Sequence, residues 1–345
     1  MVGSMRRFSL LLSVIFLTLH TDFRSPILAQ APLAASVAMD RSYGVNAPAY
    51  HALQEGRVGD AAAMLRSTLS ANSGNATAHQ LLCRAHYAQN EADEAIQQCE
   101  LAASSLLASS NLASDNQLWL GRAYGMKARH AGPLAGFALA RKVQAAFTRA
   151  LQLNPSNVAA MDDLGEYDVS APFIVGGGND KARALASSMM THFPEAAHRL
   201  LARLAEAGND LATAESEFKH AVGVQGTPQA WIDLGRFYQS HGRPDEALAS
   251  IKSGLAADRT QGPVLVDAAS ILTDAHRAPD LAERCLRGYL ASRARSDAAP
   301  AFKVHLQLSR LLAARGDSKD ANLELAVAAA LAPAFARGSR QAQGL

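Results

Sequence analysis

Cysteine and aromatic residues are scarce in this sequence. Its 345 residues include three cysteines, Cys83, Cys99 and Cys285, and 6% aromatic residues. The cysteines lack the CxxC spacing of zinc sites and are too few for a disulfide-rich framework. Because alanine is abundant and aromatic side chains are few, the composition favours helices that pack closely together.

Neither positive nor negative charge is in marked excess. The chain has 33 Lys and Arg against 31 Asp and Glu. This balance gives no indication of a nucleic-acid partner. A hydrophobic fraction of 49% is enough for a large core, in one elongated array or in two domains.

Apolar runs long enough for a membrane helix are also lacking. Arg6 and Arg7 precede the apolar run Phe8–Leu19, whose roughly 12 residues are too few for a bilayer span of about 20. We therefore expect a signal peptide over residues 1–29, cleaved after Ala29, rather than an uncleaved anchor. The mature protein would be exported, periplasmic in a bacterium, without stable membrane insertion, and would begin with a flexible leader over residues 30–41.

Catalytic and metal-binding motifs are absent from the sequence pattern. The 11 histidines are scattered, and His192 and His198 do not form the HExxH motif of zinc enzymes. Asp162 and Asp163 can be interpreted as acid–base carboxylates, but a solvated helix face is the favoured interpretation. We predict no catalytic, cofactor-binding or metal-binding residues, no cofactor and no enzymatic activity.

One glycine-rich segment leaves an alternative open. Residues 176–181 read Gly-Gly-Gly-Asn-Asp-Lys, and glycines before a helix can cradle an anion. The spacing is not that of a phosphate-binding P-loop, and Asp180 at the expected N-cap would itself occupy the backbone amides. We predict a flexible loop between two helices; a catalytic or nucleotide site in the insertion 171–181 is the alternative.

The stretch from Trp231 to Leu255 has the clearest periodicity. Four of its residues fall at i, i+3, i+4 and i+7, on one stripe of a helix: Trp231, Leu234, Gly235 and Tyr238. Gly242 suits the end of that helix, and Pro244 suits the first turn of the next. The stretch resembles one tetratricopeptide repeat, whose pattern is W-x2-L-G-x2-Y followed by A-x3-F-x2-A and P.

The same hairpin pattern recurs over residues 42–335. The other units cover residues 42–75, 76–113, 114–157, 158–194, 195–227, 262–301 and 302–335. The resemblance implies an all-α fold, a right-handed alpha solenoid of about eight tetratricopeptide-like hairpins, followed by a polar tail at 336–345. Another alpha solenoid with longer units is the alternative. The third unit is about ten residues longer than the usual 34, and its spacing around Gly132-Pro133 predicts two extended helices.

In this family the first helix of each repeat lines a concave groove, which implies a binding surface here. When each repeat is numbered from its L-G pair, position 9 of repeats two to eight holds Arg84, Arg122, Glu166, Arg203, Arg236, Ser270 and Arg310. Trp119, at position 6 of the third repeat, is expected to face the groove beside Arg122. We predict that an acidic or carboxylate-ended peptide is held there by Arg84, Trp119, Arg122, Arg203, Arg236 and Arg310.

A solvated, internally paired face is the alternative to that groove. Asp163, Asp233 and Asp267 stand at position 6 and offset the positive charge. Asp233 and Arg236 are three residues apart and can pair along one helix.

The function that the resemblance implies is a non-catalytic scaffold of the cell envelope that holds a protein or peptide partner. The alternatives are a structural subunit of an envelope or secretion assembly, or an enzyme with its site at residues 171–181. The sequence leaves the oligomeric state open.

Cys83 and Cys99 fall in the two helices of one predicted hairpin. In an oxidising compartment they can pair. Packed helix axes lie about 8–10 Å apart, however, while a disulfide needs Cα atoms within about 7 Å. Two separate core thiols are therefore favoured over a bridge.

Overall fold

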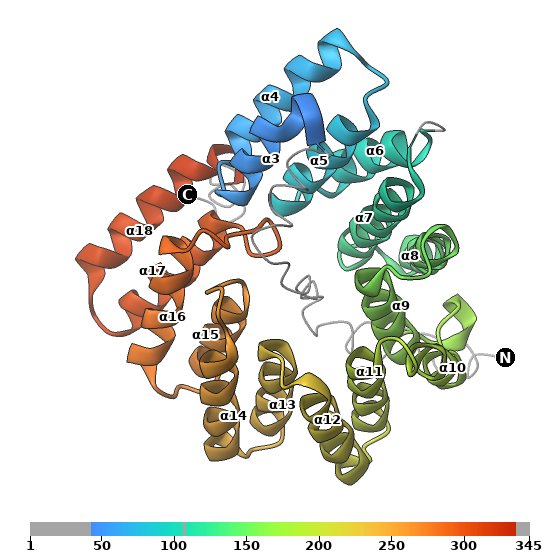
Figure 1. The fold of residues 1–345 in the computed structure, drawn as a ribbon. Helices are drawn as coiled ribbons and strands as arrows, with labels where there is room; N and C mark the ends of the chain where they lie inside the picture. Colours follow the sequence, from blue (N-terminus) through green and yellow to red (C-terminus); the bar gives the residue numbers. More distant parts are fainter. Residues whose placement is uncertain (1–42, 106–107, 336–345) are drawn as a thin grey trace, which may run out of the picture. The chain divides into compact units, whose positions relative to one another are not determined.

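The computed structural model describes residues 43–105 and 108–335, where all regular structure is helical (Figure 1). Its elements are η1 Gly44–Asn46, α3 Ala47–Gln54, α4 Val58–Ala71, α5 Ala76–Ala88, α6 Ala92–Ala103, α7 Ser110–Ala128, α8 Pro133–Leu153, α9 Val158–Ser170, η2 Phe173–Val175, α10 Asn179–Met189, α11 Pro194–Ala207, α12 Leu211–Gln225, α13 Pro228–Ser240, α14 Pro244–Ala257, α15 Val264–Asp274, α16 Pro279–Ala291, α17 Ala301–Ala314 and α18 Ser318–Leu331. Successive α-helices pair as hairpins within the two units, in α3–α4, α7–α8, α9–α10, α13–α14, α15–α16 and α17–α18. The predicted all-α solenoid of helical hairpins is confirmed.

The predicted signal peptide, leader and polar tail lie outside the described residues. Within residues 43–105 and 108–335, no helix has both the length and the apolar character that a membrane span requires.

Local sequence signals set the helix boundaries. Asn75, Asn157 and Thr227 are N-caps whose side chains accept a hydrogen bond from the backbone N–H three residues later. Proline is the first residue of α8, α11, α13, α14 and α16, where its missing N–H costs no helical hydrogen bond. The turns between paired helices contain residues with positive φ, among them Gly56, Asn90, Asn209, Gly242 and Gly316.

The third hairpin is long, as predicted. Helix α7 has 19 residues and α8 has 21, whereas α12, the next longest described helix, has 15. The two are joined by residues 129–132, so the extra length extends both helices. Val143 and Phe147 of α8 are buried.

Glycine at the L-G position lets paired helices approach closely. A Cβ added at Gly121 of α7 would overlap the ring of Phe147 in α8. A Cβ added at Gly235 of α13 would lie 3.1 Å from Ile251 of α14. The same position therefore has the same packing role in both hairpins.

The described residues form two compact units, and the chain passes from one to the other between Glu91 and Ala92 and again within α12. The first unit holds residues from Ala92 to Glu217; the second holds those up to Glu91 together with those from Phe218 onward. In the first unit, one core cluster includes Met189 of α10 and Leu200 of α11. In the second unit, one core cluster runs from Ile232 of α13 to Ala321 of α18.

The N-terminal and C-terminal hairpins share a core within the second unit. Leu53 of α3 and Leu65 of α4 pack in one cluster with Phe302 of α17 and Ala328 of α18, so the blue and red ends of the helical chain lie side by side (Figure 1). A Cβ added at Gly56 would lie 2.6 Å from that of Ala301. The first and last repeats thus cover each other's apolar faces.

The cysteines differ from the favoured expectation. Cys83 and Cys99 are both disulfide-bonded, so treating them as separate core thiols was wrong. Mean distances between helix axes do not fix the distance between an individual pair of Cα atoms. Cys285 of α16 is free and buried, and burial raises the pKa of its thiol to about 11. It is therefore a poorly reactive core residue.

Candidate partner-binding surface

Ion pairs join the first helices of successive hairpins in the first unit. Each pair links an arginine to a carboxylate one repeat away, at the following N–O distances: Arg122 (α7) to Asp163 (α9) 2.6 Å, Arg199 (α11) to Asp162 (α9) 2.9 Å, and Arg203 (α11) to Glu166 (α9) 3.2 Å. We call this set the first-helix ladder. Two of the predicted arginines, Arg122 and Arg203, therefore form contacts between repeats.

The Arg122–Asp163 pair is buried. The two side chains are 5% and 2% exposed. Burial raises the pKa of the Asp163 carboxyl, and the Arg122 guanidinium offsets part of that effect. The interpretation of Asp162 and Asp163 as a solvated face was wrong, because both pair with arginines of neighbouring repeats.

Trp119 lies beside Arg122, with the guanidinium carbon 4.8 Å from the ring centroid. Trp119 is itself 8% exposed. The aromatic and cationic side chains that the sequence suggested as a peptide grip therefore contact each other, in a largely buried arrangement.

The pair formed by Arg203 and Glu166 is the accessible part of the ladder. Their side chains are 26% and 37% exposed. Because an exposed ion pair contributes little stability in water, these side chains can exchange their contact for one with a partner at small cost.

The remaining predicted residues lie in the second unit. Arg84 is buried and forms an ion pair with Asp297, with 2.6 Å between Nε and Oδ2. Arg236 of α13 is partly exposed and lies 4.0 Å from Asp267 of α15. Arg310 of α17 is exposed. Asp233, the expected partner of Arg236 along α13, accepts a hydrogen bond from Gln229 at 3.0 Å.

The glycine-rich insertion is held by hydrogen bonds of its own. The backbone N–H groups of Gly176, Gly177 and Gly178 donate to the carbonyls of Phe173, Pro172 and Asp168. Lys181 donates from Nζ to the carbonyl of Gly176 at 2.6 Å. The N–H groups of the three glycines and the Lys181 ammonium are therefore already engaged. The predicted N-cap was also wrong, because Gly178 precedes α10 and Asp180 lies in its first turn.

Buried polar groups gather beneath this insertion. The Tyr167 hydroxyl lies 2.8 Å from the Ala140 carbonyl and 2.7 Å from that of Val175. Asp168 is buried, and burial raises its pKa to about 6, while the Lys181 ammonium offsets part of the shift. One Asp168 carboxyl oxygen makes no hydrogen bond within the described residues.

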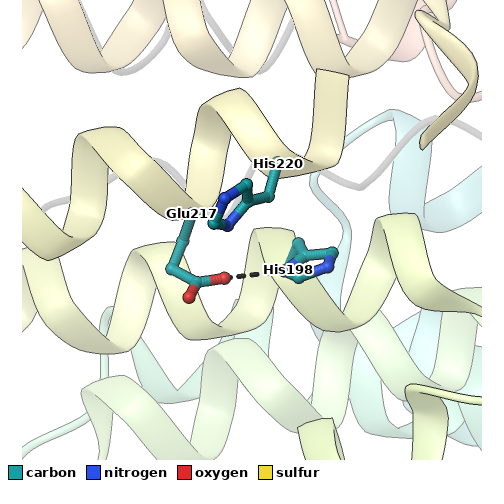
Figure 2. Close-up of side chains that lie close together, drawn as sticks. All are labelled: His198, Glu217 and His220. Atoms are coloured by element: carbon teal, nitrogen blue, oxygen red, sulfur yellow. Dashed lines mark hydrogen bonds and ion pairs between the residues drawn. The ribbon is translucent and has the colours of Figure 1, made fainter. Parts of the chain in front are cut away.

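The structure brings together one set of metal-ligand residues that no sequence spacing indicated. His198 of α11 approaches Glu217 and His220 of α12 (Figure 2). The sequence pattern missed it because its members lie on two helices, 19 residues apart at the His198–Glu217 contact.

Comparison with known proteins supports the resemblance noted from the sequence. Residues 52–112 match the sequence model described as tetratricopeptide repeat. None of the curated proteins matches the chain.

Solved structures with similar folds have low sequence identity. One is a thermophilic tetratricopeptide repeat protein from Thermus thermophilus, with 20% identity over 63% of this chain and 92% of that chain, at a TM-score of 0.41. Another is a tetratricopeptide repeat protein from Parabacteroides merdae, with 13% identity over 79% and 99% of the two chains, at 0.43. Structural matches with identity and TM-scores this low give no information about the residues of the site.

The sequence match and the recurring helical hairpins both indicate tetratricopeptide-like repeats. The match spans α4 to α6, and the same hairpin with its close glycine contact recurs in α7–α8 and α13–α14. Such repeats serve in general as protein-interaction scaffolds. The chain therefore resembles tetratricopeptide repeat proteins, and residues 52–112 match their sequence model.

Proposed function

We propose that this protein is a non-catalytic scaffold that binds an acidic protein segment through the exposed arginines of its first helices. The supporting observation is the uneven burial of the first-helix ladder. Arg122 is committed to Asp163 inside the fold, whereas Arg203 is partly exposed in a weak ion pair. An acidic segment would replace Glu166 on Arg203, and added salt would weaken the complex because the contact is charged and exposed.

The test begins with purification of a partner from the native host. Arg203→Ala should then weaken binding of that partner, while Arg183→Ala should not. Arg183 is the matched control because it lies on α10, a second helix, and is 59% exposed in an ion pair with Asp180. Full affinity of a folded Arg203→Ala variant would place the partner elsewhere.

The stoichiometry of the purified complex separates this proposal from its main alternative. A permanent, stoichiometric assembly would favour a structural subunit of an envelope or secretion complex. A reversible complex with one acidic partner would favour the scaffold.

The proposed location is the cell envelope, after export. It is supported by the arginines and short apolar run at the N-terminus and by small residues before the expected cut after Ala29. Intact-mass measurement of native protein should give a chain beginning at Gln30. A mature chain that still begins at Met1 would contradict export.

A further inference from the structure

Three possible metal ligands converge on the α11–α12 hairpin. Nδ1 of His198 lies 2.7 Å from Oε2 of Glu217. Glu217 and His220 are three residues apart on α12, so they project from the same side of that helix. One ligand atom from each of the three side chains lies within 4.8 Å of the others (Figure 2).

A second hairpin shows what the His–Glu contact does without a third ligand. In α17–α18, Nδ1 of His305 lies 2.5 Å from Oε2 of Glu324, at the same separation of 19 residues. The residue three positions after Glu324 is Val327. The His–Glu pair therefore serves as a hydrogen bond between paired helices in both hairpins. The α11–α12 hairpin differs in having the imidazole of His220 at the position where α17–α18 has the isopropyl group of Val327.

Two imidazoles and one carboxylate form a ligand set that suits zinc and similar divalent transition metals. Magnesium and calcium prefer oxygen ligands only. Ligand bonds of about 2.0–2.2 Å place neighbouring ligand atoms roughly 3.3 Å apart. Ligand atoms that are up to 4.8 Å apart would need to close by up to about 1.5 Å, while His198 and Glu217, at 2.7 Å, would move slightly apart. Partial exposure of these two side chains, at 22% and 20%, leaves room for both changes.

We propose that His198, Glu217 and His220 form a binding site for a divalent transition metal ion, with Zn²⁺ the best match. The ion would take the place of the proton between His198 and Glu217 and would gain the imidazole of His220 as its third protein ligand. Its fourth position faces solvent beside the exposed His220, where a water molecule or a donor group of a bound partner completes the coordination.

The test is a calorimetric titration of tag-free, chelator-treated full-length protein with ZnCl₂. The wild type should show a site that His220→Ala weakens by roughly tenfold or more, as expected for the loss of a ligand. His305→Ala is the matched control, because it removes the equivalent His–Glu hydrogen bond from a hairpin that lacks the third ligand. Its zinc affinity should equal that of the wild type.

Cobalt provides a second readout that weak binding to scattered histidines does not give. Tetrahedral Co²⁺ absorbs visible light intensely, so the wild type and His305→Ala should develop this absorption and His220→Ala should not. His220 is exposed, so its removal should leave the helical circular dichroism unchanged. Zinc affinity equal to the wild type in folded His220→Ala, or no zinc binding by the wild type, would overturn the proposal.

Discussion

At the scale of single residues, burial of the Asp168 carboxyl makes the free energy of unfolding depend on pH. Its pKa rises from 3.8 to about 6 because the carboxyl is buried, so the folded chain holds a proton that the unfolded chain releases. The free energy of unfolding should therefore fall as pH rises between these two values. Asp168→Asn removes this effect, so its stability relative to the wild type should increase by about 1–3 kcal/mol from pH 4 to pH 7.

Urea unfolding at several pH values measures that difference. Subtracting the wild-type curve removes any constant cost of placing an amide at this position. Asn179→Ser is the control, since it changes an exposed side chain in the same insertion that carries no titratable group, and its difference from the wild type should stay nearly constant. A flat difference for Asp168→Asn would contradict the burial argument.

At the scale of helix pairs, the glycine of the L-G pair sets how closely the two helices of a hairpin pack. Gly121→Ala would bring a methyl group into the ring of Phe147, which is fully buried and has little room to move. We expect a net loss of roughly 1–3 kcal/mol in the free energy of unfolding, because overpacking outweighs the better helix propensity of alanine.

Gly125, one turn later on α7, is the control for this prediction. Its added Cβ would lie 3.9 Å from Val143, an ordinary contact. Gly125→Ala should therefore be neutral or stabilise the protein by up to about 1 kcal/mol. Equal melting temperatures for the two variants would show that the close approach does not limit packing.

The hairpins could be predicted from the sequence because their signals are local. Glycine, proline and the i, i+3, i+4 stripe of Trp231 to Tyr238 fix where helices start, end and touch. The exposure of the arginines could not be predicted in this way. It depends on whether a neighbouring repeat supplies a carboxylate, as Asp163 does for Arg122 from 41 residues away. The sequence contained this signal, since aspartate at position 6 and arginine at position 9 recur.

The sequence pattern did not reveal the ligand set of His198, Glu217 and His220 for a related reason. Motif spacings describe ligands on one helix or loop, whereas His198 and Glu217 meet across a hairpin. A comparison of repeats at equivalent positions would have found the pair, since His305 and Glu324 repeat it at the same separation.

At the scale of the whole chain, residues that are distant in sequence hold the second unit together. Arg84 of α5 pairs with Asp297, 213 residues later, and Gln54 donates to the same carboxylate at 3.2 Å. Although burial opposes ionisation of Asp297, the Arg84 guanidinium lowers the pKa of this carboxyl. The pair therefore stabilises the fold above the unfolded-state pKa of an aspartate, and this contribution is lost as pH falls through the lower folded-state value.

Asp297→Ala should destabilise the contact between the first and last repeats more than any exposed substitution there. It leaves the Arg84 charge buried without its partner, which typically costs about 3–5 kcal/mol. Hydrogen exchange should show reduced protection in α3 to α5 and in α17 and α18 together, because these helices share one core. Lys303→Ala is the control: it removes an exposed hydrogen bond to Asn90 across the same contact and should cost less than about 1 kcal/mol. If α3 to α5 keep full protection in Asp297→Ala, the apolar cluster alone holds the two ends of the chain together, and the buried ion pair does not determine their contact.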